Sequence, residues 1–360
     1  MVENINCFGC GACENICEYD AISMEYDQKG FYLPSINKDK CVGCNKCENV
    51  CPINDINDIP NLMMQTYFFV NKDIYDRNVS SSGGFIKALA DYVFDNNGIC
   101  FGASFDDDLS VHHVEVKNRE NIYSILGSKY VQSKTGKTFQ AVKKHLDAGR
   151  MVMYTGTPCQ IAGLKSFLGH KEYKNLITVD IFCHGVPSPK LWKKYLSQYY
   201  KDKEIRYVQF RDKSLGWWQF RFRIQFAHDE YASLYRPPKD DYIKLFLQDI
   251  SINDRCLACP YRTKEKYSDF YIGDAWNINK VKRNIDDNHG ATTVIVNSER
   301  GEQIIKQIWE KHHIFKVSME DGVYSREELF QTKIESENRI KFWGECNKVG
   351  IKETMSKLDL

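Results

Sequence analysis

Eight of the fourteen cysteines lie within the first 51 residues, in two runs of identical spacing. Each run reads C-x2-C-x2-C-x3-C, which is the bacterial spacing for 4Fe-4S ligands. Three thiolates on a tight loop bind one cluster, whereas the fourth, just past the loop, binds the neighbouring cluster. The spacing therefore predicts two clusters. Their ligands are Cys7, Cys10, Cys13 and Cys51 for the first, and Cys41, Cys44, Cys47 and Cys17 for the second.

Zinc and disulfide bonds are the two alternatives that these cysteines leave open. Zinc sites favour two separated C-x2-C pairs rather than four cysteines in eleven residues. A disulfide framework needs a secreted context. Pro52 completes the second run, whereas Glu18 follows Cys17, so the first run lacks its proline. Gly9, Gly11 and Gly43 suit loops whose amides approach sulfur closely.

Four further cysteines follow a strand–loop–helix pattern later in the chain. Residues 151–155 and 176–182 read as buried strands, each followed by a cysteine and then a helix. Parallel strands end at one edge of a sheet, so these cysteines should meet a later C-x2-C pair there. One C-x2-C pair and two single cysteines at strand ends predict a third 4Fe-4S cluster, with a tetrahedral zinc site as the alternative. The residues are Cys159, Cys183, Cys256 and Cys259. Cys100 and Cys346 have no partner by spacing, and we interpret both as structural.

The elements around these cysteines predict an α/β domain. We expect a strand at 66–70, a helix after residue 84, a hairpin turning at 106–108 and helices near 138–146, 160–168 and 240–250. The strip from Trp217 to Arg223 alternates with a period near two, which favours an edge strand over the alternative of a substrate or partner surface. Residues 301–360 read as a helical, charged tail that packs on the domain or docks a partner.

Composition limits the function. The net charge of +1 gives no electrostatic case for nucleic acid, and no apolar run approaches the length of a membrane span. The first cysteine run begins at once, which leaves no room for a signal peptide. Fourteen cysteines without secretion indicate a reducing compartment, so we expect a cytoplasmic protein. No G-x-G-x-x-G follows a strand, so the sequence gives no case for a Rossmann NAD site. The P-loop-like stretch at 135–138 has Val131 in place of its first glycine, which argues against nucleotide hydrolysis.

Several stretches in a fixed order resemble the beta-subunit family of coenzyme F420 hydrogenase/dehydrogenase over about residues 66–320. They are SSGG at 81–84, GSKYVQS at 127–133, TGTPCQ at 155–160, FCHGVPS at 182–188, CLAC at 256–259 and GDAW at 273–276. The resemblance implies an iron–sulfur flavoprotein that binds FAD. Among similar proteins, archaeal ones use deazaflavin F420, plant ones reduce a chlorophyll derivative, and some bacterial ones are associated with polysaccharide synthesis.

The resemblance also implies a domain plan of mixed α+β and α/β class. We expect a ferredoxin-like module at 1–55, a linker at 56–65, and a flavin-binding domain with a parallel or mixed sheet in two parts, 66–148 and 149–320. A helical tail would cover 321–360. FAD would contact a set of residues shared with the family stretches: Ser81, Ser82, Gly83, Gly84, Lys129, Gln132, Gly156, Thr157, Asp274 and Trp276. Glycine and serine at a helix start suit a phosphate.

The sequence leaves three alternatives for the function. In the first, the chain is an enzyme that takes electrons from ferredoxin or a similar donor and passes hydride from FAD to a small-molecule or sugar-like acceptor, with His184 and Lys129 as candidate catalytic residues. In the second, it is an electron-transfer subunit of a larger complex. A zinc-stabilised binding module is the third alternative. We expect a homo-oligomer and no membrane span.

Overall fold

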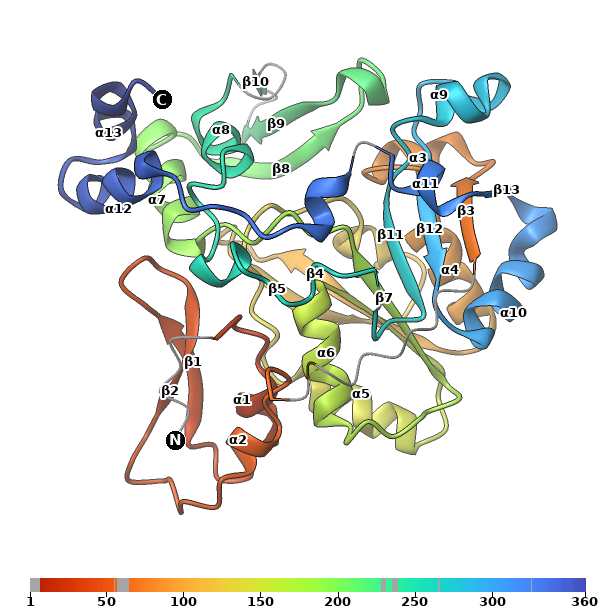
Figure 1. The fold of residues 1–360 in the computed structure, drawn as a ribbon, viewed down its shortest axis with the longest axis horizontal. Coiled ribbons are helices and arrows are strands. Elements are labelled where there is room, and N and C mark those ends of the chain that lie inside the picture. The colour runs from red at the N-terminus through yellow and green to blue at the C-terminus, as the bar shows by residue number, and fades with distance from the viewer. Residues whose placement is uncertain are drawn as a thin grey trace.

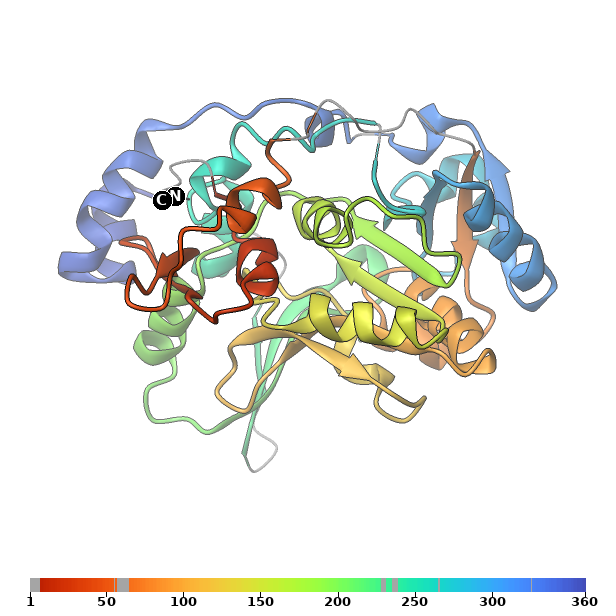
Figure 2. The same ribbon diagram turned by 90° about the horizontal axis from the view of Figure 1, so that it is seen from below.

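The computed structural model describes residues 7–54, 56, 65–227, 231–234, 239–264, 266–324 and 326–360. An eight-stranded sheet forms the middle of the molecule (Figure 1). A small N-terminal module lies beside this sheet, at the same end of the molecule as the last two helices (Figure 2). The predicted linker at 56–65 lies almost wholly outside the described residues.

The large sheet is parallel in its middle and antiparallel toward its edges. Its strand order is β13-β3-β12-β11-β7-β6-β4-β5, with parallel pairing among β11, β7, β6 and β4. This arrangement confirms the predicted mixed sheet. The strands are β3 Gln65–Val70, β4 Ile99–Phe105, β5 Val111–Val116, β6 Val152–Gly156, β7 Leu176–Ile181, β11 Phe270–Asp274, β12 Thr292–Val296 and β13 His313–Val317.

Helices cover both faces of this sheet because its inner strands are apolar on both faces. α4 (Phe85–Asp95) and α10 (Glu299–Ile308) pack on one face. α5 (Thr138–Asp147) and α6 (Pro158–Phe167) pack on the other. In β6 the side chain of Met153 joins the first core, whereas its neighbours Val152 and Tyr154 join the second. The strand and helix starts therefore agree with the predicted strand–loop–helix units.

The N-terminal module consists of a hairpin and two short helices that follow the cysteine loops. Its elements are α1 Ala12–Ile16, β1 Ile22–Tyr26, β2 Tyr32–Ile36 and α2 Lys46–Asn49. The loop glycines Gly9, Gly11 and Gly43 all have positive φ, as the tight cysteine loops require. The module shares an apolar core with α5 and α6, so it is packed against the sheet domain.

A three-stranded sheet and the C-terminal helices complete the fold. The strands are β8 Ile205–Asp212, β9 Arg221–Phe226 and β10 Tyr231–Leu234, and the remaining helices are α3 Ile74–Val79, α7 Pro189–Tyr199, α8 Asp241–Leu247, α9 Ile278–Val281, α11 Met319–Gly322, α12 Glu337–Val349 and α13 Ile351–Leu358. Among the described residues, no helix is long and apolar enough to cross a membrane.

Two expectations about these elements were wrong. β9 is the central strand of its sheet, not an edge, and a 3-10 turn at Trp217–Gln219 precedes it. The tail after residue 301 is not helical throughout, because β13 pairs with β3 in the large sheet. Within that tail, α12 and α13 bury Phe342, Cys346 and Met355 against α7, so these side chains contribute to the molecule's own core.

Candidate functional site

The first cysteine group lies at the interface between the module and α6. A small cavity there is lined by Cys7, Cys10, Cys13 and Cys51, and also by Cys47 and Cys159. Burial raises the pKa of Cys7 to about 11 and that of Cys10 to about 12, and the neighbouring thiols add to both shifts. The backbone N–H of Gly9 donates to the Cys7 sulfur over 3.2 Å. The predicted combination of three cysteines from one run with Cys51 from the other is therefore brought together.

The second group is the more exposed one. Cys41 and Cys44 are exposed, whereas Cys47 and Cys17 are partly buried. Burial raises the pKa of Cys47, and Cys41 and Cys44 raise it further, so these three thiols are neighbours. The Cys17 sulfur accepts a hydrogen bond from the backbone N–H of Ala21 over 3.3 Å.

The third group joins four cysteines from three separate segments. Burial raises the pKa of Cys159 well above its ordinary value, and the thiols of Cys259, Cys183 and Cys256 raise it further. Cys159 lies in the first turn of α6, and the Thr157 hydroxyl contacts its sulfur at 3.1 Å. Within the described part of the chain, no three His, Cys, Asp or Glu side chains converge closely enough to hold a single metal ion. A cubane instead binds each sulfur through a different iron.

Cys159 links the first and third groups. Its side chain lines the cavity of the first group while it neighbours the thiols of the third. Between the two groups, Phe8 and Tyr261 pack edge to face, with ring centroids 5.8 Å apart. Cys10 and Cys159 are both close enough to raise the pKa of Tyr261. The module therefore presents its inner cysteine group directly to the third one.

A second cavity of about 390 Å³ opens beyond the carboxyl ends of β6, β7 and β11. This is where open α/β sheets bind ligands, and the volume is typical of small-molecule sites. Cys183 lines the cavity, so the third cysteine group borders it. The cavity also contains most of the residues predicted to hold FAD or to take part in catalysis: Ser81, Ser82, Gly84, Lys129, Gly156, Thr157, His184, Asp274 and Trp276.

The loop before α4 forms one wall of the cavity. Gly84 is the N-cap residue of α4 with φ +84°, so the free amides of the first turn face the loop. The Ser81 hydroxyl contacts the Ser128 hydroxyl at 2.8 Å, and the Ser82 hydroxyl donates to the carbonyl of Ala291. These contacts hold two hydroxyl-bearing loops together at a helix N-terminus, where an anion is favoured.

Lys129 supplies a positive charge on the same wall. Its ammonium donates to the carbonyls of Leu126 and Gly127 at 2.9 and 3.3 Å. Among the described residues no carboxylate pairs with it, and burial lowers the pKa of Lys129 to about 7. An anion in the cavity would favour the charged form of this amine.

Arg211 and several aromatic rings also line the cavity. The Arg211 guanidinium binds the Asp274 carboxylate through both terminal nitrogens, at 2.9 and 3.1 Å, and lies 3.9 Å from the centre of the Phe220 ring. Its Nε is buried and has no hydrogen-bond partner in the described part of the chain. Trp276 stacks on Trp217 with ring centroids 4.4 Å apart.

Sequence reasoning missed Arg211 and Arg326 as cavity residues, and for the strip that contains Phe220 it favoured an edge strand over a substrate surface. The available signal was weak. Arg211 lies near the end of the β8 strand, and Phe220 belongs to the aromatic strip whose alternation favours an edge strand. Nothing in the spacing connects either of them with Asp274.

His184 is held at the cavity wall by charged neighbours. Its Nε2 lies 2.7 Å from the Asp249 carboxylate and 3.0 Å from the Lys333 ammonium. Lys333 also binds Asp249. The imidazole is therefore oriented by two charged groups beside Cys183.

Two predicted cofactor residues do not line the cavity. Gln132 points the other way: its amide oxygen accepts from the backbone N–H of Tyr32 at 2.8 Å, and its Nε2 donates to the carbonyl of Phe8 at 3.4 Å. Alternation explains this, because Val131 and Ser133 face the cavity and the residue between them faces the module. Gly83 packs against backbone, and a Cβ there would lie 2.4 Å from the Phe69 carbonyl oxygen.

The three cysteine groups suit an iron–sulfur protein, and comparisons with known proteins support a role in electron transfer. Residues 6–54 match a 4Fe-4S dicluster domain, and residues 149–321 match the C-terminal part of the coenzyme F420 hydrogenase/dehydrogenase beta-subunit family. The chain is therefore similar to a dicluster domain at its start and to the C-terminal part of that family over residues 149–321. These matches confirm the predicted resemblance and support an oxidoreductase role. No significant match to a curated protein was found.

Several solved chains match this one, and the following example is similar in fold over most of the chain. It is a chain from the F420-reducing [NiFe] hydrogenase complex of Methanosarcina barkeri, studied by xenon derivatization. The TM-score is 0.51 at 15% identity, and the match covers 84% of this chain and 92% of the other. At this identity the likeness establishes the fold alone.

Proposed function

We propose that the chain is an iron–sulfur flavoprotein oxidoreductase that accepts electrons from a low-potential donor such as ferredoxin and reduces an organic acceptor. The observation that carries the proposal is the position of Cys183. This residue belongs to the four-cysteine group and also lines the 390 Å³ cavity, so one site borders the other. Cys159 connects the same group with the cysteines of the module.

The thiols fit three 4Fe-4S clusters. Each group offers four cysteines, and burial and mutual repulsion raise the pKa of most of them. Thiolates in such surroundings need a cationic centre, which a metal site provides. Cys7, Cys10, Cys13 and Cys51 would hold the inner cluster of the module, and Cys41, Cys44, Cys47 and Cys17 the outer one. Cys159, Cys183, Cys256 and Cys259 would hold the third.

The second cavity fits FAD. The serine loop before α4 and Lys129 offer hydrogen-bond donors and positive charge for a pyrophosphate. Phe220 and Trp276 offer aromatic faces for a flat ring system, and Gly156 and Thr157 lie on the side of the third cysteine group. FAD, when bound, supplies the conversion between single electrons and hydride.

Residues of the chain would transfer the proton and bind the acceptor. His184 is oriented by Asp249 and Lys333 beside the cavity, and Lys129, with its pKa near 7, can hold or release a proton. The aromatic rings leave room for a flat or sugar-like acceptor. Coenzyme F420 is one candidate for that acceptor.

A second function is an electron-transfer subunit whose catalytic partner is another chain. The fold neighbour favours it, because that chain comes from a hydrogenase complex. The two proposals differ in a simple measurement. An enzyme reduces its acceptor as a purified homo-oligomer or single chain, whereas a subunit shows turnover only after its partner is added.

Anaerobic purification with iron, sulfide and flavin quantified together tests the proposal. We expect about twelve irons per chain, from three four-iron clusters, and one FAD. The Cys159→Ser variant should retain about eight irons and lose reduction of flavin by reduced ferredoxin. Cys100→Ala, in the apolar core, is the matched control and should change neither. A protein that contains zinc alone and no flavin, or undiminished flavin reduction in Cys159→Ser, would contradict the proposal.

A further inference from the structure

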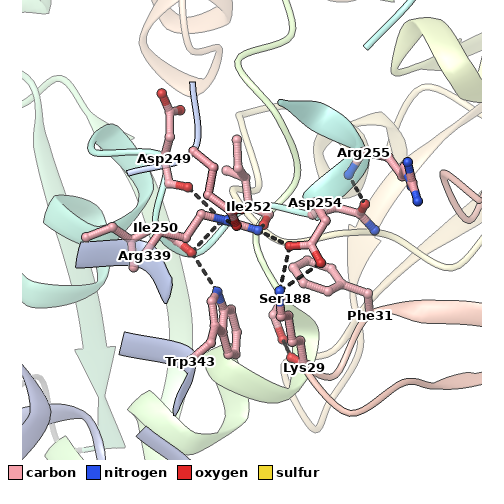
Figure 3. Close-up of polar contacts among 12 residues, drawn as sticks. Lys29, Phe31, Ser188, Asp249, Ile250, Ile252, Asp254, Arg255, Arg339 and Trp343 are labelled. Atoms are coloured by element: carbon pink, nitrogen blue, oxygen red, sulfur yellow. Dashed lines mark hydrogen bonds and ion pairs between the residues drawn. The ribbon is translucent and has the colours of Figure 1, made fainter. Parts of the chain in front are cut away.

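Arg339, a buried arginine of helix α12, binds the segment that precedes Cys256, and this segment in turn contacts the module. The side chain of Arg339 is only 1% exposed. Its terminal nitrogens donate to the carbonyls of Asp249, Ile250 and Ile252 at 2.7, 2.7 and 2.8 Å and to the Asp254 carboxylate (Figure 3). Its Nε contacts Glu335 at 3.3 Å. All five N–H donors of the guanidinium thus have an acceptor.

The segment that Arg339 holds leads directly to the third cysteine group. Asp254 begins a 3-10 turn that ends at Cys256, and the backbone N–H of Cys256 donates to the carbonyl of Asn253. The guanidinium therefore fixes the backbone immediately before two of the four thiols. Trp343, one turn further along α12, adds a hydrogen bond from its Nε1 to the carbonyl of Ile250 at 2.9 Å.

The same helix also holds the hairpin of the module. Lys29, at the turn between β1 and β2, forms an ion pair of 2.7 Å with Asp254 and lies 5.9 Å from the Trp343 ring centre. Phe31 packs against Trp343 with ring centroids 6.1 Å apart. The Ser188 hydroxyl donates to the carbonyl of Lys29 at 2.6 Å, so the turn is held from two sides (Figure 3).

We propose that Arg339 is a positioning residue that sets the separation between the module's inner cluster and the third cluster. The inference rests on the function proposed above. Asp254 is the shared contact, because it binds Arg339 on one side and Lys29 on the other. A change at Arg339 releases the ligand segment and loosens the module at the same time.

Only arginine satisfies this arrangement. A lysine would retain the positive charge but supplies three donors from one point, so it cannot reach three carbonyls and a carboxylate in a planar fork. Arg339→Lys therefore separates positioning from charge. Lys29→Met tests the module side alone, at a part-exposed position that does not threaten folding. Lys341→Ala, an exposed position on α12, is the matched control.

The experiment follows cluster reduction and flavin reduction separately, by anaerobic stopped flow with reduced ferredoxin. Hydrogen–deuterium exchange of residues 249–256 and 27–31 provides a readout independent of turnover. In Arg339→Lys, module reduction should be unchanged and flavin reduction should fall severalfold, because electron tunnelling weakens steeply as two centres move apart. Exchange should rise in both segments. Lys29→Met should slow flavin reduction about twofold to fivefold, as expected for a part-exposed ion pair.

Wild-type rates of flavin reduction and exchange in Arg339→Lys and Lys29→Met would overturn the inference. If Arg339→Lys cannot be produced as a folded protein, the rate and exchange of Lys29→Met decide the matter. A wild-type protein without a third cluster or flavin contradicts the proposed function instead, so the two failures are distinguishable. Iron content equal to that of the wild type in Arg339→Lys, combined with slow flavin reduction, supports positioning.

Discussion

Lys129 places an amine with an unusually low pKa beside the proposed phosphate site. Because burial lowers that pKa to about 7, the amine loses its charge as the pH rises through neutrality. An anionic ligand favours the protonated form, so binding takes up a proton and weakens above about pH 7. We expect the affinity for FAD to fall across this range, and Lys129→Met to bind FAD more weakly and without the pH dependence. Fluorescence titration of flavin-depleted protein measures both; parallel pH profiles of the two proteins would disprove the role.

The cysteines and the arginines differ in how far sequence could identify them. Ligands within a run are close along the chain, so their spacing is enough to predict a common site. Arg211 and Asp274 are separated by 63 positions and meet only because the end of β8 lies beside the end of β11. Arg326 likewise reaches the cavity from beyond β13. Such pairs leave no local pattern.

At the scale of the elements, α6 has a glycine where the module touches it. A Cβ added at Gly163 would lie 2.9 Å from the Cys10 sulfur, although alanine is the better helix former by about 1 kcal/mol. Gly344 in α12 has open space around it and serves as the matched helical control. We expect Gly344→Ala to stabilise the protein and Gly163→Ala to lower iron content and thermal stability. Equal gains in melting temperature for both would refute this account of packing.

The parallel part of the sheet was predictable, whereas its antiparallel part was not. β6 and β7 are short apolar runs followed at once by a helix, and that order is typical of parallel units. β13 contains the strand formers Ile314, Phe315 and Val317, but its five residues lie between helical segments, and the helical tail predicted from the sequence includes them. β9 resembles an edge strand because its central place depends on β10, which follows later in the chain.

At the scale of the molecule, the cysteine groups differ in their access to solvent. Cys41 and Cys44 are exposed, whereas the inner module group and the third group each have three partly buried cysteines and one buried cysteine. Thiol oxidation follows exposure. During brief exposure to air we therefore expect thiols of the outer group to become reactive before those of the other two groups. Maleimide labelling read by mass spectrometry gives the order; early labelling of Cys256 would be inconsistent with it.

The packing of the module against the domain could not be read from the sequence. Its contacts join positions a hundred or more residues apart, such as Tyr32 with Gln132 and Lys137 with Asp20. The sequence predicts two parts and their order, but the electron path depends on how these parts meet. Only the three-dimensional structure shows that Cys159 borders the module's inner group.

Gln132 has a consequence for protein engineering. Its amide binds the backbone of the module, while its neighbours on either side line the cavity. The amide also packs closely against Gly9, where a Cβ would lie 2.4 Å from its Nε2. A ferredoxin from another source, transplanted in place of residues 7–54, would have to reproduce this fit and the bare backbone that Gly11 presents to Thr135. The module therefore cannot be exchanged for another ferredoxin without changes to the surface that contacts the sheet domain.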